Sequence, residues 1–188
     1  MRIIYDEIAF LEDASVAALG MFDGVHIGHQ ELIRNAVTLA KSMNARSVVC
    51  TFDRHPLSVL NPDRAPKPLL TLRQNLLKFE RLGADYALVK AFTPEFGATS
   101  PETFIRELVA KMRVRAIVVG ENYTFGEGGR GDADMVRRMA GELGYRALVV
   151  APVMDGAVMA SSTYVRALLA AGETSHAARL LDIRDNVR

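Results

Sequence analysis

The chain has 188 residues, 49% of them hydrophobic and 24% charged, which is the composition of an ordinary globular protein. A single domain of this size buries roughly 70% of its unfolded surface, so it needs neither disulfides nor a structural metal to fold. Lys and Arg total 23 against 22 Asp and Glu, for a net charge of +1. This balance argues against a general nucleic-acid or membrane-surface binder, which carries a marked basic excess.

The amino-terminal residues contain no signal-peptide core, and no apolar stretch approaches the ~20 residues of a membrane span. We therefore expect a soluble, cytoplasmic protein with no membrane or nucleic-acid partner. The single cysteine, Cys50, lies inside an apolar run and cannot form an internal disulfide. We interpret it as a small buried hydrophobic residue rather than a reactive thiol.

Short β-branched apolar runs alternate along the chain with longer amphipathic segments. The runs are continuous rather than alternating in polarity, as in strands that are covered on both faces. This pattern predicts an α/β fold: a doubly wound, Rossmann-like parallel sheet of about five strands flanked by helices, in one domain spanning residues 1–188. The expected strands are 15–19, 47–52, 86–90, 116–119 and 146–150, and the expected helices are 28–43, 72–82, 101–112, 133–143 and two in the tail 161–188.

Two connections are long for a compact domain. Residues 54–70 hold four of the seven prolines, and residues 121–132 are rich in glycine. Both follow predicted strands, so both should leave the carboxyl edge of the sheet, where α/β folds bind ligands. Loops of this length are usually functional or mobile.

The turn after the first strand carries the strongest chemical signal. Gly20 ends the strand and a helix begins near Gly28, an arrangement that aims backbone N–H groups and a helix dipole at one point. His26 and His29 are three residues apart, so both imidazoles can face one anion at the helix start. A surface cap and a zinc site are the alternatives, but no cysteine or carboxylate cluster completes a ligand set, and we expect no protein-held metal.

Four segments of the chain stand out in order. They are FDGVHIGHQ at 22–30, TFDRHP at 51–56, GENYTFG at 120–126 followed by Gly131-Asp132, and SSTYVR at 161–166. Together they resemble the motifs of bacterial FAD synthetases, a family of the nucleotidylyltransferases with a HIGH-type signature. The resemblance covers nearly the whole chain, and four ordered motifs are far more specific than one. It implies transfer of AMP from ATP to the phosphate of FMN, giving FAD and pyrophosphate, with Mg2+ as cofactor.

The resemblance also implies a role for each matching residue. The catalytic residues would be His26, His29 and Arg166. The ATP-binding residues would be Gly20, Phe22, Asp23, Gly28, Ser162 and Thr163, and the flavin-binding residues would be His55, Asn122 and Phe125. A purely structural role stays open for several of these residues. Ser162 and Thr163 would belong to a helix N-cap, His55 would be a loop histidine fixed by Pro56, and Asn122 would be a turn residue after a strand.

The chain also departs from the family pattern. No riboflavin kinase domain follows the last motif, so riboflavin phosphorylation is not expected. Glu127 stands where lysine is common, and an acidic residue there should weaken phosphate binding unless Arg130 compensates. Tyr164 stands where a basic residue is common. Two alternatives therefore remain: an adenylyltransferase for another phosphorylated acceptor, and a non-catalytic flavin- or nucleotide-binding paralogue.

Overall fold

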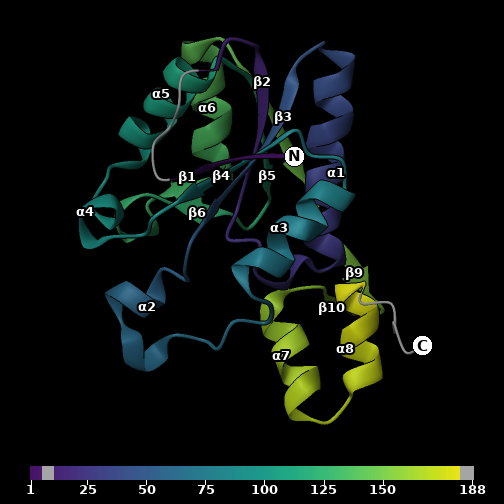
Figure 1. Cartoon of the computed structure of the whole chain (residues 1–188). Coiled ribbons are helices and arrows are strands. Elements are labelled where there is room, and N and C mark those ends of the chain that lie inside the picture. Colours follow the sequence, from purple (N-terminus) through teal and green to yellow (C-terminus); the bar gives the residue numbers. More distant parts are fainter. Residues whose placement is uncertain (6–10, 183–188) are drawn as a thin grey trace.

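A computed structural model describes residues 1–5 and 11–182 (Figure 1). Six strands form one parallel sheet in the order β1-β4-β3-β2-β5-β8. The predicted doubly wound α/β fold is confirmed, and all five predicted strands are present. The strands of the sheet are β1 Arg2–Tyr5, β2 Ser15–Leu19, β3 Arg46–Phe52, β4 Tyr86–Lys90, β5 Val114–Gly120 and β8 Arg146–Val150.

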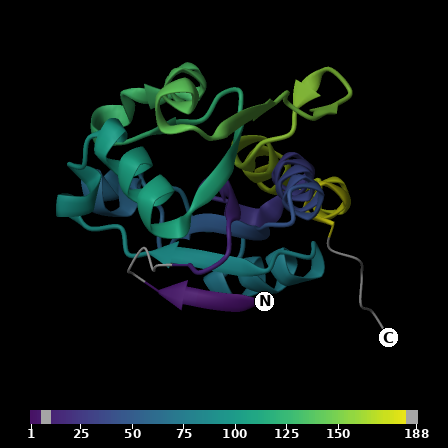
Figure 2. The same ribbon diagram turned by 90° about the horizontal axis from the view of Figure 1, so that it is seen from above.

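Helices cover both faces of the sheet (Figures 1 and 2). Successive β2 side chains point to opposite faces: Val16 and Ala18 pack with α1 and α3, whereas Ala17 and Leu19 pack with α5 and α6. This double coverage explains why the strands read as unbroken apolar runs. The main helices are α1 Ile27–Ser42, α3 Leu72–Arg81, α5 Pro101–Met112 and α6 Ala133–Leu143.

Local capping signals set several helix boundaries. Thr71 and Gln74 form a reciprocal capping box at the start of α3, and the Ser100 hydroxyl caps α5 just before Pro101. Gly144 adopts the left-handed conformation that ends α6. Each of these residues offers the backbone a partner or a conformation that the helix end requires.

The tail folds as a helical hairpin beside the sheet. Helices α7 (Ser162–Ala170) and α8 (Thr174–Leu181) pack through a small apolar cluster of their own. The two predicted tail helices are thus confirmed, while residues 183–188 of that prediction lie outside the described part of the chain. Ile27 and Leu69 pack against the same cluster, which joins the hairpin to the start of α1.

The sequence did not predict the shortest elements. β1 adds a sixth strand at one edge of the sheet, next to β4. The long connections contain α2 (Leu57–Leu60), the 3-10 turns η2 (Pro62–Arg64) and η3 (Glu127–Gly129), and a β6–β7 hairpin. The other short elements are α4 Pro94–Gly97, η1 Asp23–Val25, β6 Thr124–Phe125, β7 Gly131–Asp132, β9 Met154–Asp155 and β10 Val158–Met159.

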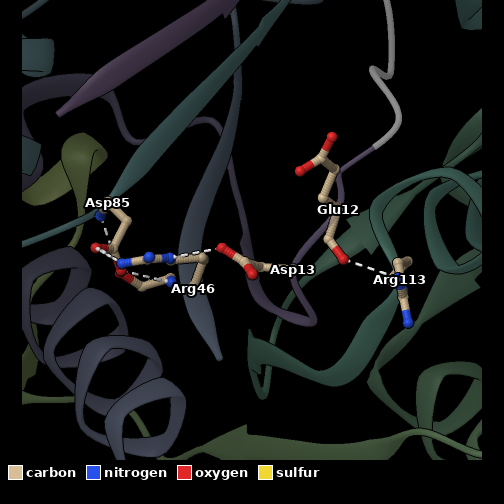
Figure 3. Close-up of polar contacts among 6 residues, drawn as sticks. Glu12, Asp13, Arg46, Asp85 and Arg113 are labelled. Carbon is tan, nitrogen blue, oxygen red and sulfur yellow. Dashed lines mark hydrogen bonds and ion pairs between the residues drawn. The ribbon is translucent and has the colours of Figure 1, made fainter. Parts of the chain in front are cut away.

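Ion pairs tie the amino ends of neighbouring strands together (Figure 3). Arg46, at the start of β3, donates to Asp13 at 3.0 Å and lies 3.7 Å from Asp85, just before β4. Arg113 donates to the carbonyl of Glu12 at 2.8 Å. These exposed contacts hold the edge of the sheet opposite the candidate site, and each adds little stability by itself. Within the described residues no helix is long and apolar enough to cross a membrane.

Candidate functional site

The site lies where the strand order reverses, between the carboxyl ends of β2 and β5. In open α/β sheets this switch point forms a crevice that receives ligands. The connection from β2 to α1 is strained there: Phe22, Gly24 and Val25 have φ values of 52°, 82° and 46°. A β-branched residue in the left-handed region is a true outlier, and such strain concentrates at functional sites.

His26 and His29 stack face to face at the start of α1. Their ring centroids are 3.7 Å apart and their planes differ by 26°. The Nδ1 atoms of both rings are buried and have no hydrogen-bond partner among the described residues. His26 is the N-cap position of α1, yet no side chain caps that helix start. Buried polar atoms without partners normally belong to a site that a ligand or water completes.

Burial keeps both imidazoles neutral at physiological pH. It lowers the pKa of His26 from 6.5 to about 4. The pKa of His29 is lowered well below its usual value, first by burial and then by the proximity of His26. Each neutral ring carries one N–H donor and one acceptor. An arriving polyanion would favour the protonated rings, so the pair can donate to phosphate oxygens and gain charge as it does so.

Glycines allow the close approach on which this geometry depends. A side chain at Gly28 would place its Cβ 3.2 Å from a ring carbon of His26 and 3.4 Å from the carbonyl oxygen of Ala160. At Gly20 a Cβ would lie 3.0 Å from the ring of Phe22. The Phe22 ring is fully buried and packs edge-on against His29, with centroids 5.2 Å apart. The absence of a side chain at Gly20 leaves room for the Phe22 ring, and that ring supports the ring of His29.

Asp23 is the node that joins the loop to the tail hairpin. Its buried carboxylate accepts the backbone N–H of Leu69 at 3.0 Å and also binds the guanidinium of Arg166. Its backbone carbonyl accepts the Ser162 hydroxyl at 2.9 Å. Arg166 donates a further bond to the carbonyl of Lys67 at 3.0 Å. Residues predicted from the first and last motifs therefore lie together. Asp23 and Arg166 form an ion pair with each other.

The remaining residues of the last cluster lie at the start of α7. Ser161 is the N-cap of α7, with its hydroxyl accepting from the amide of Tyr164 at 3.1 Å, and Thr163 is exposed in the first turn. His55 accepts the backbone N–H of Leu57 at 3.1 Å. Its pKa is lowered by burial and by the nearby charge of Arg166, so this ring too is close to the Asp23 node.

The residues after β5 leave the same edge of the sheet, because β5 runs parallel to β2. The exposed Asn122 amide donates to the sulfur of Met159 at 3.4 Å, which brings the β9–β10 hairpin to the switch point. Phe125 is buried, stacked on Tyr123 with ring centroids 5.4 Å apart. Glu127 is paired with Arg130, so the acidic replacement in the glycine-rich loop is neutralised within the loop itself.

A small apolar cleft lies along the carboxyl ends of β2, β3 and β4. Two of the aromatic rings that line it, those of Phe104 and Tyr123, come from α5 and from the turn after β5, so no local pattern of the sequence brings them together. The lining residues are Leu19, Gly20, Cys50, Thr51, Phe52, Leu88, Lys90, Phe104 and Tyr123. Lys90 also lies over the ring of Phe96, 5.5 Å from its centroid. Burial raises the pKa of Cys50 to about 12, consistent with an inert thiol.

The described residues contain no group of three or more His, Cys, Asp or Glu side chains that could hold a metal ion. The one buried carboxylate at the site, that of Asp23, already accepts from Leu69 and Arg166. Neutral imidazoles, backbone amides and an arginine shared with Asp23 can together bind an anion.

Comparisons with known proteins agree with this geometry. The sequence model of the FAD synthetase family matches residues 10–164. The chain is 33% identical over 171 residues to the bifunctional riboflavin kinase/FMN adenylyltransferase of Escherichia coli K12, and 35% identical over 170 residues to that of Bacillus subtilis 168. These matches cover 90% and 89% of this chain and 55% and 53% of the relatives, so the chain spans about half of their length.

A putative bifunctional riboflavin kinase/FMN adenylyltransferase of Geobacillus thermodenitrificans is 35% identical, with 89% of each chain covered. Among solved structures, the crystal structure of a macrolide-efflux protein from Streptococcus pneumoniae superposes with a TM-score of 0.86 at 28% identity. That match covers 97% of this chain and 60% of the other. Since the family model spans most of the sequence, this chain belongs to the FAD synthetase family.

Proposed function

We propose that the chain is an FMN adenylyltransferase that transfers AMP from ATP to FMN and releases pyrophosphate. The observation that carries the proposal is the stacked pair His26 and His29, whose buried Nδ1 atoms have no partner at the uncapped start of α1. Membership of the FAD synthetase family makes the triphosphate of ATP the expected anion.

The triphosphate would lie over the start of α1, within reach of the tail helix α7. His26 and His29 would donate to it from one side, and Thr163 and Arg166 from the other. Asp23 neutralises part of the Arg166 charge, so we expect Arg166 to use its remaining N–H groups on phosphate while it stays bonded to Asp23. Ser162 would act indirectly, because its hydroxyl is engaged by the loop.

The flavin would occupy the opposite part of the carboxyl edge. The apolar cleft between β2, β3 and β4 is lined by Phe104 and Tyr123, which offer flat surfaces to an aromatic ring. Asn122 lies at the end of β5, where its amide can give up the weak bond to Met159 and bind a polar flavin group instead. Phe125 would support Tyr123 by stacking, and His55 would face the phosphate of FMN.

The reaction needs position and charge stabilisation rather than a covalent intermediate. A phosphate oxygen of FMN is ionised at neutral pH and can attack the α-phosphorus in line, so no general base is required. Negative charge then develops on the leaving pyrophosphate. The two imidazoles and the first amides of α1 would stabilise that charge, since their hydrogen bonds strengthen as it grows.

Mg2+ would arrive with ATP and would supply positive charge to its phosphate groups. The protein would hold the nucleotide, and through it the ion. We further propose that the enzyme works in the cytoplasm on small molecules alone.

The test is purified protein incubated with ATP, Mg2+ and FMN, with FAD and pyrophosphate measured by chromatography. The proposal predicts equal amounts of the two products and no reaction when riboflavin, which lacks the phosphate nucleophile, replaces FMN. Turnover only with a different phosphorylated acceptor would reassign the substrate. Tight flavin binding without turnover would indicate a non-catalytic paralogue and refute the enzyme.

A further inference from the structure

The strained loop before α1 is held by one buried side chain. Gln30, the fourth residue of α1, is 4% exposed, and its Nε2 donates to the carbonyl oxygen of Val25 at 3.0 Å. Val25 is the β-branched residue with a φ of 46°. A conformation of this kind persists only where the surroundings fix it, and this bond fixes the carbonyl of the strained residue directly.

A second bond sets the orientation of the Gln30 amide. Arg34, one turn further along α1, donates from Nη2 to the Oε1 of Gln30 at 2.8 Å. An oxygen that accepts from Arg34 leaves the amide nitrogen facing Val25, where it can only donate. Two hydrogen bonds therefore run in one direction, from Arg34 to Gln30 and from Gln30 to the carbonyl of Val25.

This chain of bonds ends at the peptide that leads into the histidine pair. The carbonyl of Val25 and the amide nitrogen of His26 belong to the same planar peptide group, so fixing one fixes the other. The backbone amide of Gln30 also donates to the carbonyl of His26 at 2.9 Å. Gln30 thus holds the backbone on both sides of His26, and His26 in turn stacks on His29.

Ordinary helix capping does not explain the contact. In a capping box a side chain accepts an amide hydrogen at the helix start, whereas Gln30 donates to a carbonyl that precedes the N-cap His26. The bond leaves the first amides of α1 open to an anion. It stabilises the loop shape without occupying the groups that the ligand would use.

We propose that Gln30 is a positioning residue for the phosphate-binding histidines, with Arg34 orienting its amide. The proposal rests on the proposed adenylyl transfer for its kinetic consequence, though not for its structural one. Loss of the Gln30 bond would let Val25 relax out of the left-handed region and would tilt the peptide before His26. Displacements of about 1 Å in such a group cost up to ~10²-fold in rate.

Three variants separate the bonds. Gln30→Met removes both, Gln30→Glu keeps the bond from Arg34 and removes the donor to Val25, and Arg34→Met removes only the orienting bond. The first two should lower kcat for FAD formation roughly 10- to 100-fold, with the KM for FMN changed less than about twofold. Arg34→Met should give a smaller fall in kcat. Asn35→Ala, which loses a bond to Glu31 on the same helix, is the matched control and should match wild type.

Imidazole NMR tests the structural consequence without any activity. The chain has only four histidines, so each ring can be assigned and titrated. In Gln30→Met the pKa of His26 should rise from about 4 toward 6.5 as the stacked rings loosen. If wild type makes no FAD but this shift occurs, the positioning claim survives and the function fails. A folded variant with unchanged His26 signals and wild-type kcat would overturn the proposal, as would a fall in melting temperature alone.

Discussion

The carboxylate of Asp23 binds the guanidinium of Arg166 across 143 positions of the chain. The side chains of these residues are 8% and 24% exposed, so the pair is largely shielded from water. It fastens the tail helix α7 to the loop between β2 and α1. The first and last motifs of the sequence therefore form one structural unit, and a nucleotide bound there would contact both.

Asp23→Asn should destabilise the protein by about 1–3 kcal/mol, because it leaves a half-buried guanidinium without its counter-charge. The amide oxygen can still accept from Leu69, so the loss reports mainly on Arg166. Urea unfolding at pH 7 measures the change. Glu142→Gln is the control, since its pair with Arg106 is about half exposed and should cost less than about 1 kcal/mol. Equal losses of stability in the two variants would show that the Asp23–Arg166 pair stabilises the protein no more than an exposed ion pair does.

His29→Ala should reduce turnover by about 10²-fold or more if this ring stabilises charge in the transition state. His26→Ala should have an effect of similar size, because the two rings stack and face the same anion. Steady-state FAD formation at saturating ATP and FMN measures both. His176→Ala provides the control. The His176 ring, in the tail helix α8, contacts Asp155 of β9, so its loss should leave kcat unchanged. A folded His29→Ala variant with the wild-type rate would remove His29 from the mechanism.

Stability should fall in mild acid because of the histidine pair. The folded-state pKa of His26 is about 4, against 6.5 for the free side chain. Between these values the unfolded chain binds a proton that the folded chain excludes, so unfolding becomes easier as the pH falls. The loss approaches about 3 kcal/mol by pH 4. Urea midpoints at several pH values should therefore fall less steeply for His26→Asn than for wild type. Parallel profiles would contradict the burial of this ring.

Asn122→Ala should raise the KM for FMN more than the KM for ATP. The amide lies just after β5 and donates to Met159 of the β9–β10 hairpin, and the proposed function has it bind a polar group of the flavin. Initial rates with each substrate varied in turn provide the comparison. A larger effect on ATP than on FMN would mean that the two pockets are assigned the wrong way round.

Much of the fold followed from the sequence because its signals are local. Both faces of the sheet are covered by helices, so the five predicted strands appear as unbroken apolar runs, and residues such as Thr71 and Ser100 cap helices through their near neighbours. β1 escaped prediction because its four residues are mostly exposed and pair only at one edge. The β9–β10 hairpin is too short to show a period at all.

The candidate site was predictable in part for the same reason. The strand–loop–helix pattern was enough to predict His26 and His29. No local pattern predicts that the carboxylate of Asp23 faces Arg166, because that contact depends on where the tail hairpin packs. The aromatic lining of the cleft was missed for a similar reason: Phe104 and Tyr123 belong to segments that converge only in the folded sheet. The strain at Val25 is equally invisible in the sequence, because φ is a property of the fold.

A crystal structure of the protein with ATP and Mg2+ tests the central claim most directly. The account predicts that triphosphate oxygens lie within hydrogen-bond distance, about 2.7–3.2 Å, of imidazole nitrogens of His26 and His29 and of amides at the start of α1. The Asp23–Arg166 contact should persist in that complex. ATP bound elsewhere, or a bound triphosphate out of reach of both rings, would contradict it.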